Sequence, residues 1–451
     1  MSRMQSVPTS SRAGSNLRFP SLAVLLLACL ALMLTTAGCE RGGGLPEDHK
    51  LVVIGFDAAD WALIDPLVEA GRMPVMARFL EQSTAGVNMS FVPLVGSPQI
   101  WASMATGRMP DAHGIQGFVR REGDKLSLKQ QWLAPAYWDL AGAVGQTSCV
   151  IGWWLTHPAR DIAGVMVSDA NTYTIQGFRD DAGLVRPDVL REDLAALKVD
   201  YRDITLAELG RFIDLDSLAG HEEAMASRLD KLRTMIAGDR SYLAMAAYLA
   251  PRSEFDVFSL YFRGLDLSCH TFWPYYRPDQ RNEDLDPVAV AVFGEVIPNY
   301  YVYCDELLGE MLALFPDDRS VMILSDHGFE GLTTQKGKLL KGVMAHRPHG
   351  VYAVRSPLHQ QGYRFDSTPI INVCPTILAL MGLPASEEMP GLVIREGLTA
   401  AGLRWVEQLE GNRVASYQTL APVYADSVGV QDESEVDEAV IRQLRSLGYI
   451  D

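Results

Sequence analysis

Short apolar runs alternate along this chain with stretches of helical spacing, and this alternation limits the folds that the chain can adopt. Residues 50–56 form an apolar run with two valines and an isoleucine, which ends just before Asp57. Runs of the same kind follow at 148–152, 165–168, 255–262 and 321–325. Buried strands of parallel sheets have this continuous apolar character. The pattern therefore predicts an α/β fold around a mostly parallel sheet.

Helical spacing of apolar residues separates the predicted strands. It is seen over residues 64–82, 305–315 and 370–381, the last with Pro375 near its start. Residues 171–250 are mixed and polar at first and then helical from Glu222 to Leu249. We interpret this segment as an insertion over the functional site of the α/β fold rather than an independent domain. In parallel sheets, ligands bind beyond the carboxyl ends of the strands, where most of the polar residues considered below fall.

The first forty residues have the pattern of an export signal. Three arginines precede an apolar run over residues 22–34, which is followed by Thr36, Ala37, Gly38 and Cys39. A basic head, a short apolar core and small residues at a cleavage site are typical of a signal peptide. The apolar core is short for a transmembrane helix. The ending resembles a bacterial lipobox, with Thr36 in place of the usual leucine.

The resemblance to a lipobox implies a lipid on Cys39, which would anchor the chain to a membrane on the periplasmic face of the cell envelope. Glu40, in place of an aspartate directly after the cysteine, favours sorting to the outer membrane. An ordinary signal peptide cut nearby, or an uncleaved anchor, is the alternative. We divide the chain into a signal peptide (1–38), a flexible tether (39–48), a catalytic domain (49–400) and a C-terminal extension (401–451) that ends in an amphipathic helix.

Charge and composition narrow the possible partners. The formal net charge is -17, so electrostatics give no reason to expect nucleic-acid binding. An anionic substrate must then be held by something other than surface charge, and bound cations would serve. The tryptophans, including Trp153 and Trp154, are expected in the core. Buried free thiols are favoured over disulfides for the four cysteines beyond Cys39, although export would permit pairing.

Several acidic residues, histidines and one serine lie in or beside the predicted strand ends and loops. Each has an ordinary structural explanation, such as a helix cap, a turn, a surface pair or an exposed loop. The residues concerned are Asp57, Ser97, Asp266, His270, Asp326, His327, His346 and His349. Taken together, they are a suitable inventory for two metal ions, zinc or manganese, because carboxylates and imidazoles are their usual ligands.

Spacing supports this interpretation at two places. Asp266 and His270 are four residues apart, so both side chains can converge on one ion from a single helical turn. Adjacent Asp326 and His327 point in different directions and suit one ion or a bridging role. A serine beside a divalent cation loses its proton more easily and becomes a nucleophile at neutral pH.

Seven segments of the chain, in the order in which they occur, resemble those of the alkaline phosphatase superfamily, in particular its type I phosphodiesterase and nucleotide pyrophosphatase family. The resemblance spans residues 51–391 and is carried by IGFDAADW, MPVMARFLEQSTAG, VPLVGSPQIWASMATGRMPDAHGI, YFRGLDLSCHTFWPY, SDHGF, AHRPHG and INVCPTILALMGLP. It implies a three-layer sandwich with a central, mostly parallel sheet and a metal-dependent phosphodiesterase or phosphatase. The implied substrate is a phosphorylated small molecule, lipid or nucleotide.

The resemblance also implies roles for individual residues. The family's nucleophile lies ten residues before the glycine of Thr106-Gly107, which gives Ser97 and implies a phosphoseryl intermediate. One metal ion would be held by Asp57, Ser97, Asp326 and His327. The other would be held by Asp266, His270 and a late histidine. We prefer His346 to His349, because relatives often have the pattern His-Arg-x-x-Gly.

One departure bears on the substrate. The nucleotide pyrophosphatase branch has an asparagine downstream of the nucleophile that helps to hold a phosphate oxygen, and no asparagine lies between Ser97 and Gly107. Nucleotide substrates are therefore not favoured, and a backbone amide or another donor must replace the asparagine. A phosphomonoesterase, a phospho-group transferase and a non-catalytic envelope lipoprotein with a degenerate site are alternatives. A sulfatase is disfavoured, since Pro98 directly follows Ser97 and the sulfatase modification motif is missing.

Overall fold

The computed structural model describes residue 45 and residues 49–118, 120–122, 125–127, 132–172, 183–280, 285–331 and 345–418. The predicted signal peptide, the tether apart from Leu45, and the predicted C-terminal amphipathic helix lie outside these residues. Within the described ranges, no helix has both the length and the apolar character needed to span a membrane.

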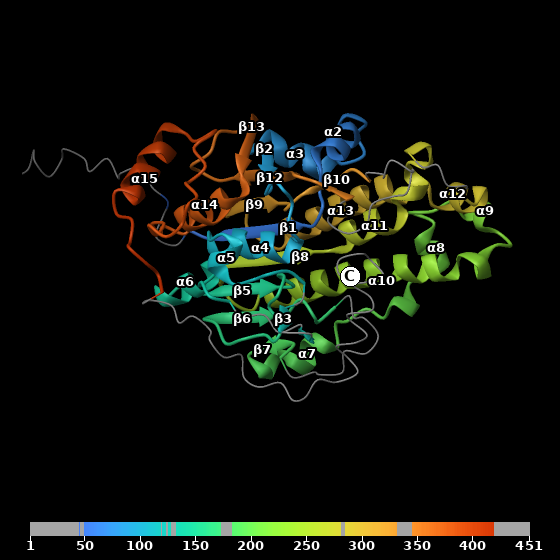
Figure 1. Ribbon diagram of the computed structural model, residues 1–451, viewed down its shortest axis with the longest axis horizontal. Helices are drawn as coiled ribbons and strands as arrows, with labels where there is room; N and C mark the ends of the chain where they lie inside the picture. Colours follow the sequence, from blue (N-terminus) through green and yellow to red (C-terminus); the bar gives the residue numbers. More distant parts are fainter. Residues whose placement is uncertain are drawn as a thin grey trace, which may run out of the picture. The chain divides into compact units, whose positions relative to one another are not determined.

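A nine-stranded sheet organises the described chain (Figure 1). Its strands are β1 (Leu51–Phe56), β2 (Thr84–Met89), β5 (Ser148–Ile151), β6 (Gly164–Val167), β7 (Val185–Arg186), β8 (Val257–Phe262), β9 (Ser320–Leu324), β12 (His349–Arg355) and β13 (Tyr363–Pro369). Two small antiparallel pairs are β3 (Arg120–Glu122) with β4 (Lys125–Ser127), and β10 (Gly328–Phe329) with β11 (His346–Arg347).

Helices connect most of these strands. They are α2 (Trp61–Glu69), α3 (Pro74–Glu81), α4 (Ser97–Thr106), α5 (Pro110–His113), α6 (Tyr137–Ala143), α7 (Arg191–Ala195), α8 (Leu206–Leu209), α9 (Leu215–Leu218), α10 (Glu222–Leu249), α11 (Gly264–Tyr276), α12 (Pro287–Phe293), α13 (Val296–Ala313), α14 (Val373–Leu380) and α15 (Ala400–Glu410).

The strand order is β13-β2-β12-β9-β1-β8-β5-β6-β7. The five strands from β9 to β6 all pair in parallel. β12 is antiparallel to its two neighbours, and β7 closes the other edge antiparallel to β6. The sheet is thus mostly parallel and confirms the predicted fold class.

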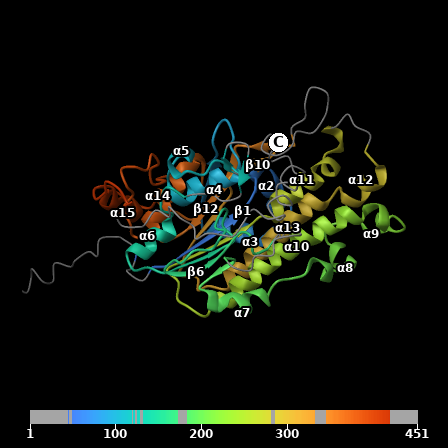
Figure 2. The same cartoon turned by 60° about the horizontal axis from the view of Figure 1, so that its bottom comes forward.

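Alternate side chains of the central strands enter two separate cores, which makes the fold a three-layer sandwich. From β1, Val52 and Ile54 belong to a core shared with α2, α3, α10, α11 and α13. Leu51 and Val53 belong to a second core, shared with α4, α6, α14 and α15. Figure 2 shows α6, α14 and α15 on one side of the strands and α10 and α13 on the other. A parallel strand covered on both faces is apolar throughout, as the sequence of β1 is.

The structure departs from the sequence prediction within residues 64–82, where two helices replace one. α2 ends at Glu69 and α3 begins at Pro74. Gly71 has φ 70° between them, a left-handed conformation that ends a helix. Proline suits the first position of the next helix, where its missing N–H is not needed. The strands β2, β12 and β13 were not predicted from the sequence.

The segment at 171–250 contributes to the sheet as well as to its helical layer. β7 pairs with β6, and α10 packs against α11, α13 and β8. α10 runs over Glu222–Leu249, as its spacing predicts. Cys149, Cys269, Cys304 and Cys374 are buried and free, as their apolar neighbours suggested.

Shortening Ile54 tests the dependence of the fold on the first core. Its side chain is 0% exposed at the centre of β1, so Ile54→Ala leaves a cavity and should lower the free energy of unfolding by about 2–5 kcal/mol. Val189→Ala is the control, because Val189 is 82% exposed and should change that free energy by less than about 0.5 kcal/mol. Urea denaturation of the chain from Glu40 onward measures both. Equal effects would contradict this packing.

Candidate active site

Chain segments from five strands meet at one edge of the sheet. Asp57 follows β1, Asp266 lies in the helix after β8, and Asp326 follows β9. These three strands are neighbours and parallel, so their carboxyl ends coincide. Ser97 begins α4, beyond the end of β2, and His346 lies just before β12, whose start is at the same edge because it runs antiparallel. Topology alone therefore gathers residues that are distant in the sequence.

The first group of side chains surrounds Nε2 of His327. This atom lies 3.0 Å from Oγ of Ser97, 3.4 Å from Oδ1 of Asp57 and 3.2 Å from Oδ2 of Asp326. All four residues are at most 1% exposed. The structure thus brings together the four residues that the sequence assigned to one site.

Hydrogen bonds from outside the group orient these side chains. Nδ1 of His327 lies 3.1 Å from the carbonyl oxygen of Gly328, which only accepts, so Nδ1 is the donor in this contact and Nε2 faces the group. Oδ2 of Asp57 accepts from the hydroxyl of Tyr261 and from Nε1 of Trp154, the latter at 3.3 Å. Oδ1 of Asp57 is left to face His327. Such outer partners fix the direction in which ligand atoms point.

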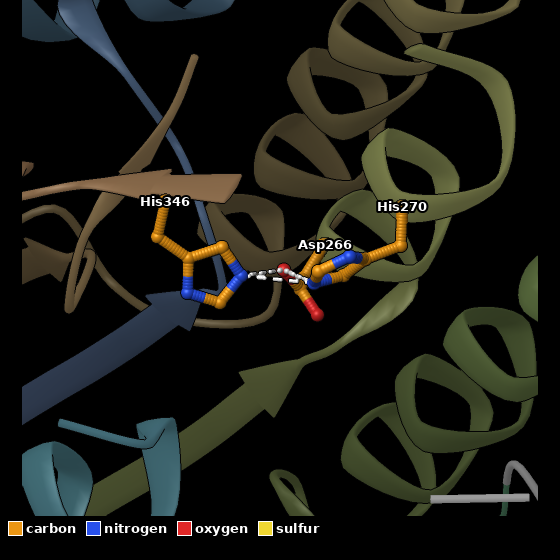
Figure 3. Close-up of side chains that lie close together, drawn as sticks. All are labelled: Asp266, His270 and His346. Atoms are coloured by element: carbon orange, nitrogen blue, oxygen red, sulfur yellow. Dashed lines mark hydrogen bonds and ion pairs between the residues drawn. The ribbon is translucent and has the colours of Figure 1, made fainter. Parts of the chain in front are cut away.

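The second group consists of Asp266, His270 and His346 (Figure 3). Oδ1 of Asp266 lies 3.3 Å from Nε2 of His270 and 3.4 Å from Nε2 of His346, and the two nitrogens are 2.8 Å apart. Figure 3 shows His270 and Asp266 reaching from α11 toward His346 on the opposite side. The i, i+4 spacing places the first two on one face of the helix. His349 is not in this group.

The two groups are directly adjacent. The rings of His327 and His346 stack with centroids 3.7 Å apart and an angle of 17° between them. One ligand atom each from Asp57, Asp266 and His327 also lie within 4.8 Å of one another. The two groups therefore form one continuous site.

The donor atoms fit metal ions. Metal–ligand bonds of about 2.1 Å in a tetrahedron place ligand atoms about 3.4 Å apart, and the separations in both groups run from 2.8 to 3.4 Å. Oδ1 of Asp57 and Oδ2 of Asp326 are buried and accept no hydrogen bond from the described chain. Buried acceptors without donors are costly unless a cation neutralises them.

Electrostatics point the same way. Burial raises the pKa of Asp57, and the carboxylate of Asp266 raises it further. Burial and the carboxylate of Asp57 raise the pKa of Asp326 well above its usual range. Burial lowers the pKa of His346 to about 3, with a further contribution from His327, so this imidazole is neutral at pH 7 and able to act as a ligand. A divalent cation would remove the mutual repulsion of the carboxylates.

Comparison with known protein families decides the affiliation. The family model described as type I phosphodiesterase / nucleotide pyrophosphatase matches residues 51–375, which include both groups and all nine strands of the central sheet. The chain belongs to this family. Membership in the family supports hydrolysis of phosphoesters as the general activity. The two Asp/His groups are what such an enzyme would use to hold metal.

Two solved structures resemble this chain at low sequence identity. A putative sulfatase from Bacteroides thetaiotaomicron is 11% identical with a TM-score of 0.50, covering 81% of this chain and 75% of that one. Murine ectonucleotide pyrophosphatase/phosphodiesterase 5 is 10% identical with a TM-score of 0.47, covering 78% of this chain and all of that one. No curated protein sequence matched significantly. The sulfatase comparison supports the fold alone.

Two glycines of the matched family motifs allow close backbone approach at the site. A Cβ on Gly328, in SDHGF, would collide with the carboxylate of Asp60. A Cβ on Gly350, in HRPHG, would collide with the carbonyl of Ser325 and approach the backbone of His327. These contacts hold the segments of His327 and His346 against each other, which explains the glycine after each histidine motif.

Arg347 fixes the segment that carries His346. Its Nε lies 3.1 Å from Oδ2 of Asp60, a residue that is 1% exposed and caps α2. His349 follows Arg347 by two residues, begins β12 and does not belong to the second group. The geometry thus separates the two candidate histidines that the sequence left open.

Several residues around the groups were missed in the sequence. Trp154 and Tyr261 bond to Asp57 but were expected, if at all, as core. Asp239 of α10 accepts from the backbone N–H of Gly264 at 3.3 Å and from the hydroxyl of Tyr300 at 2.5 Å, so it holds the start of α11. An aspartate within an otherwise buried stretch of a long helix was the one available signal for Asp239.

His346→Ala and His349→Ala test which histidine binds metal. His346→Ala should weaken zinc binding at least about 100-fold, because even an outer partner of a metal ligand contributes about 10- to 100-fold. His349→Ala should leave zinc affinity within about threefold of the wild type, since His349 lies outside the second group. Zinc affinity is measured by titration against a competing chelator. Loss in His349→Ala with retention in His346→Ala would contradict the assignment.

Proposed function

We propose that this protein hydrolyses phosphodiester bonds through a phosphoseryl intermediate on Ser97. The observation that carries the proposal is the position of Oγ of Ser97, 3.0 Å from Nε2 of His327 and beside two buried carboxylates. A hydroxyl in this position has the right neighbours for a nucleophile that acts with divalent cations. Family membership supports the choice of phosphorus as the electrophile.

The location of Ser97 in the fold suits attack on phosphorus. Ser97 is the first residue of α4, and the N-terminus of a helix favours negative charge. Gln99 accepts a hydrogen bond from the N–H of Gly96 at 3.0 Å and so holds the turn into the helix. Ser97 would attack in line and the leaving group would depart. Water would then cleave the phosphoseryl bond and regenerate the hydroxyl.

Two divalent cations, zinc or manganese, complete the proposal. Asp57, Ser97, Asp326 and His327 would hold one, and Asp266, His270 and His346 would hold the other. When bound, such ions favour the deprotonated nucleophile and neutralise charge on the phosphoryl oxygens. The side chains would hold the ions, and their packing leaves Ser97 only 1% exposed.

Two other kinds of function are compatible with the same site. Monoester hydrolysis or transfer of the phosphoryl group to an alcohol would use the same intermediate, and they differ only in the leaving group or in the acceptor. A non-catalytic envelope lipoprotein would have the fold without turnover. The complete set of ligand atoms in both groups favours catalysis over this second case.

Ser97→Ala tests the nucleophile. Turnover of a chromogenic phosphodiester by the chain from Glu40 onward should fall by at least about 1,000-fold, because the covalent step is lost. Zinc content should fall only in part, since three ligands of the first group and the whole second group remain. Turnover is measured spectrophotometrically with zinc and with manganese, and metal content by elemental analysis.

Ser97→Thr is the matched control, since threonine keeps a hydroxyl and should retain measurable turnover. The corresponding monoester and sulfate ester, assayed in parallel, identify the preferred bond. Normal turnover in Ser97→Ala would rule out the phosphoseryl route. A metal-free protein inert on all three esters would favour the non-catalytic lipoprotein.

We further propose that the protein is exported and anchored by a lipid on Cys39, on the strength of the lipobox-like ending at residues 36–39. In a bacterium that processes lipoproteins, the full chain should incorporate radiolabelled palmitate and sediment with membranes. Cys39→Ser should abolish labelling and release the protein. Cys29→Ser, which changes the other cysteine of this region, should do neither. Labelling of Cys39→Ser would contradict the anchor.

A further inference from the structure

A buried amide in the central sheet lies outside both groups of candidate ligands. Asn88 belongs to β2 and is 0% exposed. Its Oδ1 is buried and accepts no hydrogen bond from the described chain. Asparagine is depleted in strands, and a buried amide with an unpaired acceptor is costlier than an apolar side chain at the same position. The presence of such a residue points to a task for its amide nitrogen.

The amide nitrogen of Asn88 reaches across one strand of the sheet. Asn88 is paired with Gly350 of β12, and β12 separates β2 from β9. Nδ2 donates to the carbonyl oxygen of Ser325, directly after β9, at 2.9 Å. A carbonyl oxygen only accepts, so this contact also fixes which end of the amide faces it. Gly350 leaves room beside this oxygen, because a Cβ there would lie 2.4 Å from it.

Ser325 is held at each of its polar groups and comes immediately before two candidate ligands. Its N–H donates to the carbonyl of Val351 at 2.8 Å. Its hydroxyl donates to the carbonyl of His327, also at 2.8 Å. Its own carbonyl accepts from Asn88. Because the peptide unit is planar, holding this carbonyl oxygen also holds the Cα of Asp326.

The same amide contacts the helix that begins with the candidate nucleophile. Nδ2 of Asn88 lies 3.6 Å from Sδ of Met104, a weak acceptor in α4. Ser97 is the first residue of α4, and Met104 lies two turns further along. Asn88 therefore lies where this helix meets the end of β9, the segment that continues into Asp326 and His327.

We propose that Asn88 is a positioning residue for the metal ion of the first group, because it holds the peptide unit that precedes Asp326. This inference rests on the proposed function, since it requires a cation at that group. Asn88 acts through Ser325 rather than on the metal or the substrate. Outer partners of metal ligands contribute about 10- to 100-fold to metal affinity or activity. The contacts of Asn88 lead to the first group, so the effect should be absent from the second.

Asn88→Ala tests the inference at each group separately. With the second group disabled by His346→Ala, the change should weaken the remaining zinc binding by about 10- to 100-fold. With the first group disabled by His327→Ala, it should alter zinc affinity by less than about threefold. Affinities are measured by titration against a competing chelator. General loosening of the fold would not give a loss confined to one background.

Three further variants make the measurement specific to the amide. Asn88→Thr suits a strand and lacks the amide, so it should behave as Asn88→Ala does, even if that variant folds poorly. Asn88→Gln keeps the amide and should retain more zinc affinity than either. Asn299→Ala is the matched control, because Nδ2 of Asn299 also donates to a backbone carbonyl, that of Phe212, at 3.3 Å. Its zinc affinity and turnover should equal those of the wild type.

Turnover gives an independent result. Hydrolysis of the preferred phosphate ester by Asn88→Ala should fall about 10- to 100-fold at limiting zinc and recover at least in part at saturating zinc, whereas wild-type turnover should gain less.

Equal weakening of zinc binding in the two backgrounds would overturn the inference, because Asn88 would then support the fold as a whole. Unchanged affinity in both backgrounds would overturn it as well. In either case, loss of turnover in Ser97→Ala leaves the proposed function standing. Normal turnover in Ser97→Ala, with a zinc loss confined to the His346→Ala background, would reject the phosphoseryl route and support the positioning role of Asn88.

Discussion

The parallel pairing of β9, β1 and β8 is the constraint on which the rest of the structure depends. Each of these strands is covered on both faces and is largely apolar along its length, so the charged side chains lie just beyond its end. Asp57, Asp266 and Asp326 are such residues. Because neighbouring parallel strands end together, three carboxylates are forced into one small, buried volume.

This concentration of charge has an electrostatic cost that the surrounding chain is built to limit. The donors around the carboxylates take up only some of their oxygens: Tyr261 and Trp154 bond to Oδ2 of Asp57, while Oδ1 faces His327. A site designed merely for stability would pair or replace these groups with apolar ones. Their retention in a converging geometry with the imidazoles of His270, His327 and His346 is the pattern expected of metal ligands.

Much of this arrangement is visible in the sequence, and the limits of the prediction have physical reasons. The central strands were recognised because a strand buried on both faces is a continuous apolar run, as in residues 51–56. β13 was not predicted because most of its side chains are exposed and its sequence, YRFDSTP, is polar. The break between α2 and α3 was not predicted because apolar residues occur on both sides of Gly71 and Pro74. These two residues are the local signals that end one helix and begin the next.

The residues of the candidate site likewise divide into those that the sequence predicts and those that it does not. Asp57, Asp326 and His327 stand out because they follow apolar strands, and Asp266 with His270 because of their spacing. Spacing does not decide between His346 and His349, but the family pattern favours His346, and the structure places that residue in the second group. Trp154 was not expected at the site. A tryptophan in an apolar context reads as core, and only its distance to Asp57 reveals a second role.

α11 then emerges as the element that carries two side chains of the second group. Asp266 and His270 lie on one face of it, and Asp239 of α10 accepts from the N–H of its first residue, Gly264. A shift of this helix start would move both candidate ligands together. A variant on α11 that loses activity is therefore uninformative by rate alone, and metal content must be measured beside it. Packing of α10 against α11, with the buried carboxylate of Asp239 at the contact, keeps the two side chains in position.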